Sequence, residues 1–569
     1  MTRGVLTLAA VAVAFAAADT YVVVLALPDI MTGVGLSVEQ LQKAAPIVSG
    51  FLLGYVAMLP LIGRIADVRG RPPVLVAGLV VFAFGSLVTT LADDLPTMVA
   101  GRFLQGVGGG ALVPATLALV ADLYPVERRG VPLGVVSAVQ ELGAVLGPLF
   151  GAVVLAVADW RAIFAINLVV GLVLALLIRL RGGEAISRRP DLVGLFLLAA
   201  MFAAGVLLAV RPGPLVRDLT WGELYVPLVG SGDWLTPLGV TTIAAAVLLV
   251  AWCALAPRPL IDLRGWAASA RDADLVGAVF LAVALGGVVL AFATADPKVQ
   301  VFSAQGGWYL LAAALGALAF AVHLRRAESP LVPRGALRRM PAWGSVVVSL
   351  FVGAALVAAL IDVPLFARTT VYPDSQLLAA LVLVRFLVAL PVGAVLGGAL
   401  IRRLPAGPVA AVGMLLAAGG FWWMSAWGLD SLHHWHASVP LVVGGLGFGL
   451  ALAPVNAAVL ASTTADVHGL AGAMVVVARM IGMLVGVSAL TTLGLRRYYA
   501  EQGDVPPIKE VCHGASRCRE FTLLLKQAGI AQEQTVFAGA AVAAVLAAVL
   551  ALLLLRGAPT RGLDKVRAG

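Results

Sequence analysis

The sequence predicts an all-α protein that crosses a membrane many times. Hydrophobic residues make up 61% of the 569-residue chain and charged residues only 12%, whereas a soluble domain carries about 25% charged residues. Apolar runs of about 20 residues, the length that spans a bilayer as a helix, follow one another along the whole chain. Some Gly, Pro and ionisable residues recur in the same order near both ends of the chain, which indicates an internal repeat.

Sixteen transmembrane helices are expected where apolar runs lie between charged or Pro-rich breaks, and fourteen is the alternative count. The first run is too long for a signal peptide, lacks a small-residue cleavage site and is followed directly by further runs. The expected ranges are 4–28, 45–63, 73–92, 97–121, 131–157, 161–180, 192–210, 237–256, 275–295, 308–324, 343–363, 377–400, 409–427, 438–461, 469–495 and 536–555.

The distribution of Lys and Arg predicts the orientation of these helices. Basic residues gather in alternate loops, such as "GRIADVRGR" (63–71), "ERRG" (127–130) and "IRRLPAG" (401–407). Because cytoplasmic loops carry the excess of Lys and Arg, both termini are expected in the cytoplasm. The abundance of Ala, Gly and Val, with Arg favoured over Lys, is typical of a GC-rich bacterial genome. We therefore expect a multi-pass protein of the bacterial inner membrane. The net charge of +9 lies in these short loops and does not indicate a nucleic-acid partner.

Two parts of the chain resemble each other in the order of their motifs. "QGVGGGALVP" (105–114) corresponds to "GGLGFGLALAP" (444–454), and "GVVSAVQELGAVLG" (134–147) to "GAMVVVARMIGMLVG" (472–486). We therefore expect six-helix halves at residues 1–181 and 341–569, with a long outer loop at 496–535.

The intervening region 182–340 is predicted to contain two transmembrane hairpins that copy one another. "DLVG" begins the apolar runs at 191 and 274, and the loops "PRPLIDLR" (257–264) and "SPLVPRGALRR" (329–339) close the two hairpins.

Short polar and Gly-rich motifs indicate a family. The loop "GRIADVRGRP" combines Gly63, Asp67, Arg69, Gly70 and Arg71. Its Asp can pair with an Arg or accept backbone hydrogen bonds at a helix start, so that the loop locks one conformation. This spacing resembles the loop signature of the major facilitator superfamily, although Pro72 replaces a usual basic residue.

Three further motifs carry the same resemblance. "RFLQG" (102–106) is similar to the superfamily's fourth-helix motif. "GAVLGPLFGA" resembles the fifth-helix motif of its proton-driven exporters, through Gly143, Gly147, Pro148 and Gly151. "DTYVVVLALPDI" (19–30) resembles the first helix of fourteen-spanner drug/proton antiporters. The detailed resemblance is closest to mycobacterial exporters of drugs and of lipids (triacylglycerides). It implies the major facilitator fold, two six-helix halves here joined by four additional helices.

Ionisable residues inside the apolar runs are the candidate functional residues. A charge at mid-bilayer costs about 2.5–3.5 kcal/mol on insertion scales, so Asp19 and Glu141 are the proton-coupling candidates. Arg102 is the expected cation for Asp19, because helices one and four adjoin in the superfamily fold. A purely structural buried ion pair is the alternative for each. Gln105, Asp362, Asn456 and Arg479 are candidates for the substrate cavity, although location at the membrane interface explains Asp362 equally well.

The remaining polar groups give little sign of metal or nucleotide chemistry. Cys512 and Cys518 fall in the outer loop, where an oxidising exterior favours a disulfide. The "HHWH" segment (433–436) is typical of an interfacial belt, and no metal site is expected. The sequence has no GxxxxGK[ST] loop for ATP, so no cofactor is expected and a proton gradient is the expected energy source.

These observations predict a secondary active transporter and not an enzyme. We expect proton-coupled export of lipophilic or amphipathic drugs or lipids by alternating access, with the protein acting as a monomer. The alternatives are a lipid-specific transporter to the periplasm with incidental drug efflux, and a non-transporting sensor or scaffold. A membrane acyl or glycosyl transferase is disfavoured, because no convincing His/Asp or paired-acid site is present. Expected partners are lipophilic molecules, membrane lipids and a periplasmic carrier protein.

Overall fold

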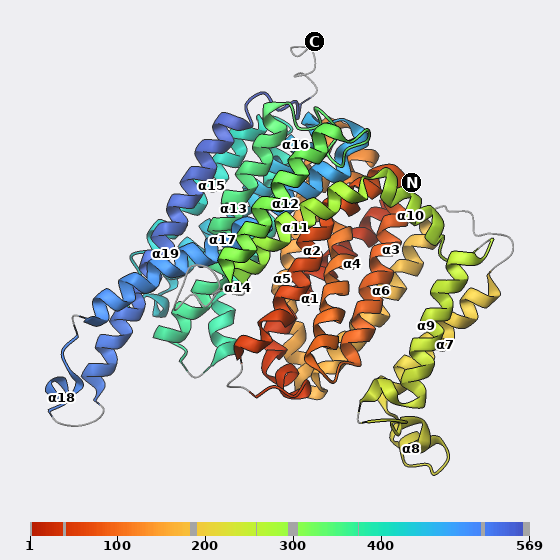
Figure 1. Cartoon of the computed structure of the whole chain (residues 1–569). Coiled ribbons are helices and arrows are strands. Elements are labelled where there is room, and N and C mark those ends of the chain that lie inside the picture. Colours follow the sequence, from red (N-terminus) through yellow and green to blue (C-terminus); the bar gives the residue numbers. More distant parts are fainter. Residues whose placement is uncertain are drawn as a thin grey trace. The chain divides into compact units, whose positions relative to one another are not determined.

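The computed structural model describes residues 3–37, 41–182, 191–230, 232–257, 259–293, 305–373, 375–503, 505–513 and 518–561. Within these residues the regular structure is entirely helical (Figure 1). The first six long helices are α1 (Arg3–Gly33), α2 (Leu41–Arg69), α3 (Arg71–Thr90), α4 (Leu95–Leu123), α5 (Gly130–Val157) and α6 (Trp160–Arg181).

The middle region supplies four more long helices and two shorter ones. These are α7 (Leu192–Val210), α8 (Gly213–Val216), α9 (Pro237–Leu255), α10 (Leu263–Asp272), α11 (Leu275–Ala293) and α12 (Gly306–Arg326). The remaining helices are α13 (Met340–Thr370), α14 (Gln376–Leu400), α15 (Ala406–Met424), α16 (Ser438–Ser462), α17 (His468–Gly503), α18 (Ile508–Val511) and α19 (Arg519–Leu554). Single 3-10 turns lie at Val126–Arg128, Trp221–Tyr225, Asp233–Leu235, Ser431–His433, Trp435–Ala437 and Ala465–Val467.

The predicted all-α, multi-pass fold is confirmed. In the described part of the chain, thirteen helices are long and apolar enough to cross a membrane. Shorter apolar stretches lie at Gly4–Thr20 within α1 and at Leu192–Leu208 within α7. Each predicted range contains a long helix, but the number that crosses the membrane, sixteen or fourteen, stays a prediction.

Packing divides the chain into two compact units. Unit 1 comprises 1–115, 146–279 and 326–331, and unit 2 comprises 116–145, 280–325 and 332–569. These units cut α4 and α5, because the first turns of α5 pack closely on α14: a Cβ on Gly130 or Gly134 would collide with a backbone carbonyl of α14. The predicted boundaries at 181 and 341 stay a prediction.

Unit 1 depends on glycines that let its helices approach closely. On α4, a Cβ at Gly106 would strike the carbonyl oxygen of Phe51 in α2. A Cβ at Gly108 would strike the backbone of Phe82 in α3. Small residues at helix crossings allow backbone contact, which is how membrane helices gain packing energy without a hydrophobic driving force. The "QGVGGG" run therefore makes α4 the central helix of this packing.

The two predicted linker hairpins share one detailed feature. Asp191 accepts hydrogen bonds from the backbone N–H groups of Gly194 (2.9 Å) and Leu260 (2.7 Å). Asp274 accepts the same pair, from Gly277 (2.9 Å) and Leu331 (2.8 Å). Each carboxylate caps the first helix of its hairpin and holds the Pro-Leu loop that follows the second. The shared pattern supports the view that the hairpins are copies.

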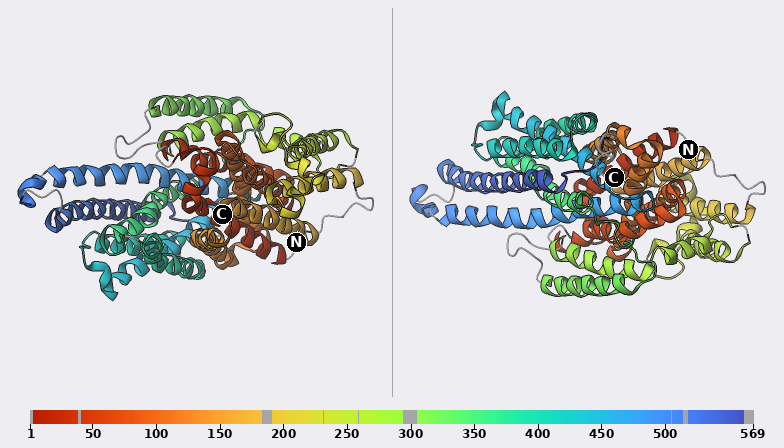
Figure 2. Two further views of the ribbon diagram at one scale, coloured as in Figure 1. Left: turned by 90° about the horizontal axis from the view of Figure 1, so that it is seen from below. Right: turned by 90° about the horizontal axis from the view of Figure 1, so that it is seen from above.

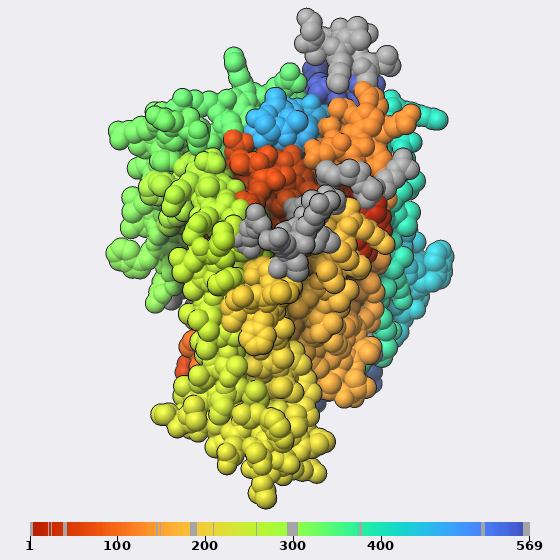
Figure 3. Space-filling view, turned by 90° about the vertical axis from the view of Figure 1, so that its right-hand side faces the viewer, coloured from red at the N-terminus to blue at the C-terminus, as the bar shows by residue number. Residues whose placement is uncertain are grey.

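The end of the first hairpin is built from residues 211–235, which appear in yellow in Figure 3. Arg211 pairs with Asp233 there, and the backbone N–H of Asp233 donates to Asp93 between α3 and α4. This hydrogen bond attaches the hairpin to the first helices of unit 1.

In unit 2, α17 and α19 extend beyond the length that a bilayer requires. Each has 36 residues, where about 20 suffice. In Figures 1 and 2 their α18 end projects past the ends of α14 and α15. The segment 496–535, expected as a long loop, is therefore mostly helical. Its charged residues ended the apolar pattern without ending the helices.

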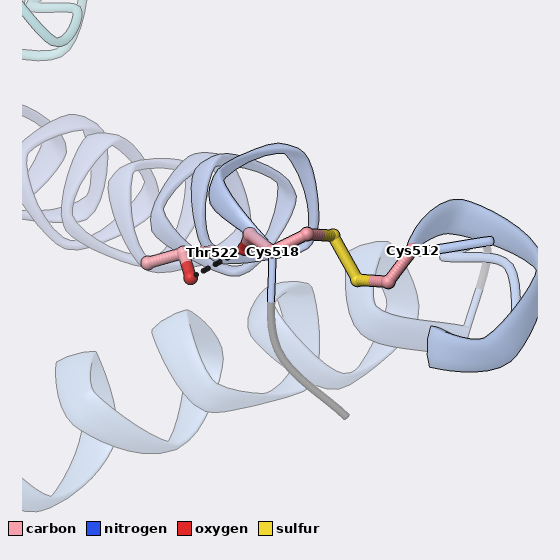
Figure 4. Close-up of a disulfide and its surroundings, with 3 residues drawn as sticks. All are labelled: Cys512, Cys518 and Thr522. Carbon is pink, nitrogen blue, oxygen red and sulfur yellow. Dashed lines mark hydrogen bonds between the residues drawn. A yellow bond between two sulfur atoms is a disulfide. The ribbon is translucent and has the colours of Figure 1, made fainter. Parts of the chain in front are cut away.

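A disulfide joins Cys512 to Cys518 at the end of this hairpin (Figure 4). Cys518 is the residue that directly precedes α19, and its backbone carbonyl accepts a hydrogen bond from Thr522 (3.0 Å). The disulfide thus ties the end of α18 to the start of α19.

Candidate transport site

Asp19 and Arg102 form a buried ion pair in unit 1. Arg102 Nη1 lies 2.6 Å from Asp19 Oδ2, and the two residues are 1% and 2% exposed. Asp19 occupies the middle of α1, and Arg102 the second turn of α4. A charge buried in an apolar environment must be paired to be tolerated, and each residue supplies the partner that the other requires.

A polar network surrounds this ion pair. Asn167 of α6 donates to the other oxygen of Asp19. Gln105 accepts from Arg102 (2.9 Å) and donates to Ser86 of α3 (2.9 Å). The network thus connects α1, α3, α4 and α6 through side chains that are all buried.

The Arg102 guanidinium is also held between aromatic rings. Its central carbon lies 4.5 Å from the ring centre of Phe51 in α2 and 5.9 Å from that of Phe164 in α6. Its Nε donates to the backbone carbonyl of Ile47 at 3.4 Å. Such cation–π contacts strengthen when water is excluded. Arg102 is therefore fixed in place, and protonation of Asp19 would change the balance of charge around it.

A second pair of opposite charges lies in unit 2. Arg479 Nη1 of α17 is 3.9 Å from Glu141 Oε1 of α5, and both residues are largely buried. This separation is an ion-pair distance but too long for a hydrogen bond. The two residues occupy equivalent places in the sequence repeat, and the structure brings them together.

Asn456 also lies near α5. Its Nδ2 donates to the hydroxyl of Ser137 at 3.2 Å, and both side chains are buried. Of the predicted cavity residues, Asn456 and Arg479 therefore both face α5, whereas Gln105 belongs to the network around Asp19.

The loop motif connects α2 to α3. Arg71 pairs with Asp67 at 3.1 Å and donates to the carbonyl of Ala66 at 2.6 Å. Gly70 has a φ of 96°, a conformation that favours glycine. Arg69 faces away from this pair, toward α10 of the linker.

Arg69 is bound by three residues of the α10 region. Its guanidinium lies 3.1 Å from Asp262 and donates to Ser269 at 3.3 Å. It also lies 4.6 Å from the ring centre of Trp266. Backbone N–H donation by Gly265, followed by the hydrogen bond from Arg69, lowers the pKa of Asp262. The linker region therefore contacts the loop motif directly through Arg69.

The fifth-helix motif (Gly143, Gly147, Pro148 and Gly151) lies on α5. A Cβ at Gly147 would collide with the carbonyl oxygen of Ala18, the residue before Asp19. Gly147 therefore lets α5 approach α1 beside the ion pair. Gly143 and Gly151 are buried in the same helix. The side chain of Pro148 lies outside the described part of the structure.

Asp362 is buried within unit 2 and only 5% exposed; its position relative to the membrane interface stays a prediction. Its carboxyl group lies close to that of Glu533 in α19. Glu533 gave no signal in the sequence because it lies in a charged stretch. The sequence also did not mark Asn167, Ser86 or Thr89 as site residues, because neutral polar residues are common in membrane helices. Thr89 belongs to the network because its hydroxyl donates to Gln105 at 3.4 Å.

Unit 1 contains a largely apolar cavity of about 920 Å³. Its walls come from α2, α3, α4, α6, α7 and the segment around α10, and Arg69, Arg179 and Asp262 are its charged lining residues. Ligand pockets of proteins occupy about 300–1,000 Å³, so the cavity has room for a sizeable apolar group.

The histidines of the "HHWH" segment do not gather around an ion site. His434 and His436 stack at 5.1 Å between ring centres. Within the residues that the structure describes, no three His, Cys, Asp or Glu side chains are grouped to hold a metal ion.

Comparisons with known proteins agree on one family. The model of the Major Facilitator Superfamily matches residues 9–487. A triacylglyceride transporter of Mycolicibacterium hassiacum is 35% identical over 561 residues, which cover 95% of this chain and 90% of the relative. A triacylglyceride transporter of Mycobacterium tuberculosis is 34% identical over 576 residues, which cover 97% and 94%.

Among solved structures, the proton:xylose symporter XylE matches with a TM-score of 0.56 and 15% identity. The match covers 99% of this chain and 98% of XylE, and at this identity it shows the fold alone. The family model and the relatives extend over nearly the whole chain. This multi-pass membrane protein therefore belongs to the major facilitator superfamily and is a transporter, not an enzyme.

Proposed function

We propose that this transporter exports lipids across the membrane in exchange for protons. The observation that carries the proposal is the buried Asp19–Arg102 pair at 2.6 Å, with Asn167 as a further partner of Asp19. A carboxylate held between a cation and a low-dielectric interior can gain or lose a proton when its surroundings change. Its cost in a membrane helix favours a functional role.

The proton on Asp19 is proposed to act through Arg102. Protonation removes the negative charge, so Arg102 keeps only its neutral partners and its two aromatic neighbours. The contact between α1 and α4 then weakens, and the helices can rearrange. Because Gly147 of α5 lies beside Ala18 of α1, a movement of α1 would also displace α5.

Glu141 and Arg479 are proposed to act as the second proton-linked pair. Their separation of 3.9 Å leaves room for a closer contact in another state of the cycle. A proton on Glu141 would release Arg479. In the loop motif, the Asp67–Arg71 pair at 3.1 Å is proposed to stabilise the outward-facing state.

Acylglycerols are the proposed substrate class. Two relatives named triacylglyceride transporters align with 95% and 97% of this chain, and the apolar cavity of unit 1 is large enough for acyl chains. Efflux of lipophilic drugs is the second candidate, favoured by the resemblance of residues 19–30 to drug/proton antiporters. We further propose that the long α17–α19 hairpin meets a carrier protein in the periplasm. We also propose that the protein lies in the inner membrane with both termini in the cytoplasm. It is proposed to act as a monomer and without a cofactor.

Transport by proteoliposomes tests the proposal. A labelled triacylglycerol is incorporated with purified protein, and its transfer to an external acceptor is measured with and without a pH gradient. Export should increase when the side that represents the periplasm is acidified, and Asp19→Asn should abolish this increase.

Glu501→Gln is the matched control, because Glu501 is an acid of α17 whose ion pair in the described structure is with Arg497 of the same helix. Transfer that ignores the gradient in wild-type protein would refute proton coupling. A protein that moves a lipophilic dye but no triacylglycerol would be a drug transporter, and one that moves neither would favour the scaffold.

A further inference from the structure

Two carboxyl groups lie against each other in unit 2, away from the pairs already described. Asp362 of α13 and Glu533 of α19 are 5% and 2% exposed. Their carboxyl groups lie close enough to interact with each other. Two ionised carboxylates repel one another and offer no proton to share, so this contact requires that one of them be protonated.

The other contacts of Glu533 do not supply the missing donor. Its Oε1 accepts a weak hydrogen bond from Gln532 at 3.3 Å. Its Oε2 is buried without a hydrogen-bond partner among the N–H and O–H donors of the described residues. A buried carboxylate oxygen without a donor is costly, and a proton held between the two acids would satisfy it.

No cation neutralises the pair in the described part of the chain. Helices α15 and α16 carry no titratable residue. Arg479 of α17 pairs with Glu141, and Arg385 of α14 donates to Ser438. The other titratable residues of α13, α17, α18 and α19 include none that forms an ion pair with Asp362 or Glu533 in the described structure; they include Arg368, Arg496, Arg497, Tyr498, Tyr499, Glu501, Lys509, Glu510, Arg519, Glu520 and Lys526.

Aromatic side chains lie within one turn of each acid along its helix. Phe366 lies one turn after Asp362 on α13, and Phe537 one turn after Glu533 on α19. Their ring centres are 6.4 Å apart, and Trp427 lies 5.3 Å from Phe366 and 5.9 Å from Phe537. Phe366 and Phe537 are fully buried, so the neighbourhood of both acids is apolar, which further disfavours two negative charges.

We propose that Asp362 and Glu533 form a proton-binding site in unit 2, separate from Asp19, that holds one proton between the two carboxyl groups. The proton joins α13 to α19. Its loss leaves two negative charges in contact, so the two helices separate or admit water. A link between this proton and export rests on the proposed function; the presence of the proton does not.

The arrangement resembles that of Asp19 in unit 1. Asp19 on α1 accepts from Asn167 on α6, and Asp362 on α13 faces Glu533 on α19. In the predicted halves these are the first and sixth helices. The first half uses a neutral amide and a cation as partners of its acid, whereas the second uses another acid, which requires a proton.

Conservative amides test the site. In Glu533→Gln the side-chain amide donates to Asp362 without needing a proton, and Asp362→Asn does the same in the opposite direction. The infrared spectrum of the purified protein should lose one band of a protonated carboxyl group in each variant. Glu501→Gln, which alters an acid of α17, should keep that band.

Thermal stability between neutral and alkaline pH gives an independent readout. Wild-type protein should lose stability as the pH rises and the shared proton leaves, whereas both amide variants should lose less. A wild-type spectrum and alkaline stability profile that match those of both variants would overturn the proposal. Neither measurement involves lipid transport, so the failure of lipid export would leave this result intact.

Discussion

Asp191 and Asp274 make the same two backbone hydrogen bonds, one at the start of each linker hairpin. Each accepts from the Gly three residues later and from a Leu in the loop that closes its hairpin. A recurring tetrapeptide alone is weak evidence of duplication. A carboxylate that performs the same double role in both copies is stronger, because it requires the loops to match as well.

The two aspartates provide a matched pair of variants. Asp191→Ala should release the amides of Gly194 and Leu260, and removal of the helix cap should cost about 1 kcal/mol. Asp274→Ala should release only those of Gly277 and Leu331. Hydrogen exchange measured by mass spectrometry detects each change. If either variant raised hydrogen exchange equally in both hairpins, the hydrogen bonds of Asp191 and Asp274 would not act locally.

Breaking the Asp19–Arg102 pair should destabilise the protein strongly. Arg102→Gln or Asp19→Asn leaves one buried charge without its partner, which costs about 3–5 kcal/mol. The double variant leaves no charge and should lose less than the sum of the two single variants. Denaturant titration of the purified protein in detergent measures these free energies. Losses that simply add would mean that the two residues are not energetically coupled.

Gly147 should tolerate no side chain. Gly147→Ala places a Cβ against the carbonyl oxygen of Ala18, and such overpacking costs about 1–3 kcal/mol. Gly419 in α15 is the control, since a Cβ there meets no atom within 4 Å. Gly419→Ala should be neutral or stabilise the helix by up to about 1 kcal/mol. Thermal unfolding of both variants measures these effects. Equal unfolding midpoints would contradict the close approach of α5 to α1 at Gly147.

The sequence predicted those features that cost free energy in a membrane. A lone carboxylate in the run around Asp19 demands an internal partner, and Arg102 is the cation that the resemblance places next to it. The helix ranges follow for the same reason, since lipid leaves no alternative to helical hydrogen bonding. Charge inside an apolar run therefore identified the candidate residues, and the pairing of Glu141 with Arg479 came only from the structure.

Other features carried no such signal. Asn167 is a neutral residue whose role depends on where α6 packs. Glu533 lies in "REFTLLLKQAGIAQEQ" (519–534), which has the composition of an exposed helix. Its burial arises only because α13 packs against that part of α19. Hydropathy reports depth in the membrane and not helicity, which is why 496–535 was expected to be a loop.

Acid should weaken the contact between the linker and the loop motif. Hydrogen bonds from Gly265 and Arg69 lower the pKa of Asp262, so the contact is present above the usual carboxyl pKa of about 3.9. It is lost as the pH falls through the lowered value in the folded protein. Because the Asp262 side chain is 56% exposed, losing the Asp262–Arg69 contact should lower the stability of the protein only slightly. The movement of Arg69 should nevertheless be detectable.

Trp266 reports that change, because its ring lies 4.6 Å from the Arg69 guanidinium. The fluorescence difference between wild-type protein and Trp266→Phe should shift on acidification, and Asp262→Asn should remove the shift. Asp218→Asn should preserve it, because the pKa of Asp218 is lowered by the backbone N–H groups of Trp221 and Thr220, with no contact to Arg69. An unchanged shift in Asp262→Asn would mean that Asp262 does not control the position of Arg69. Loss of the shift together with slower lipid export would connect the linker to the transport cycle.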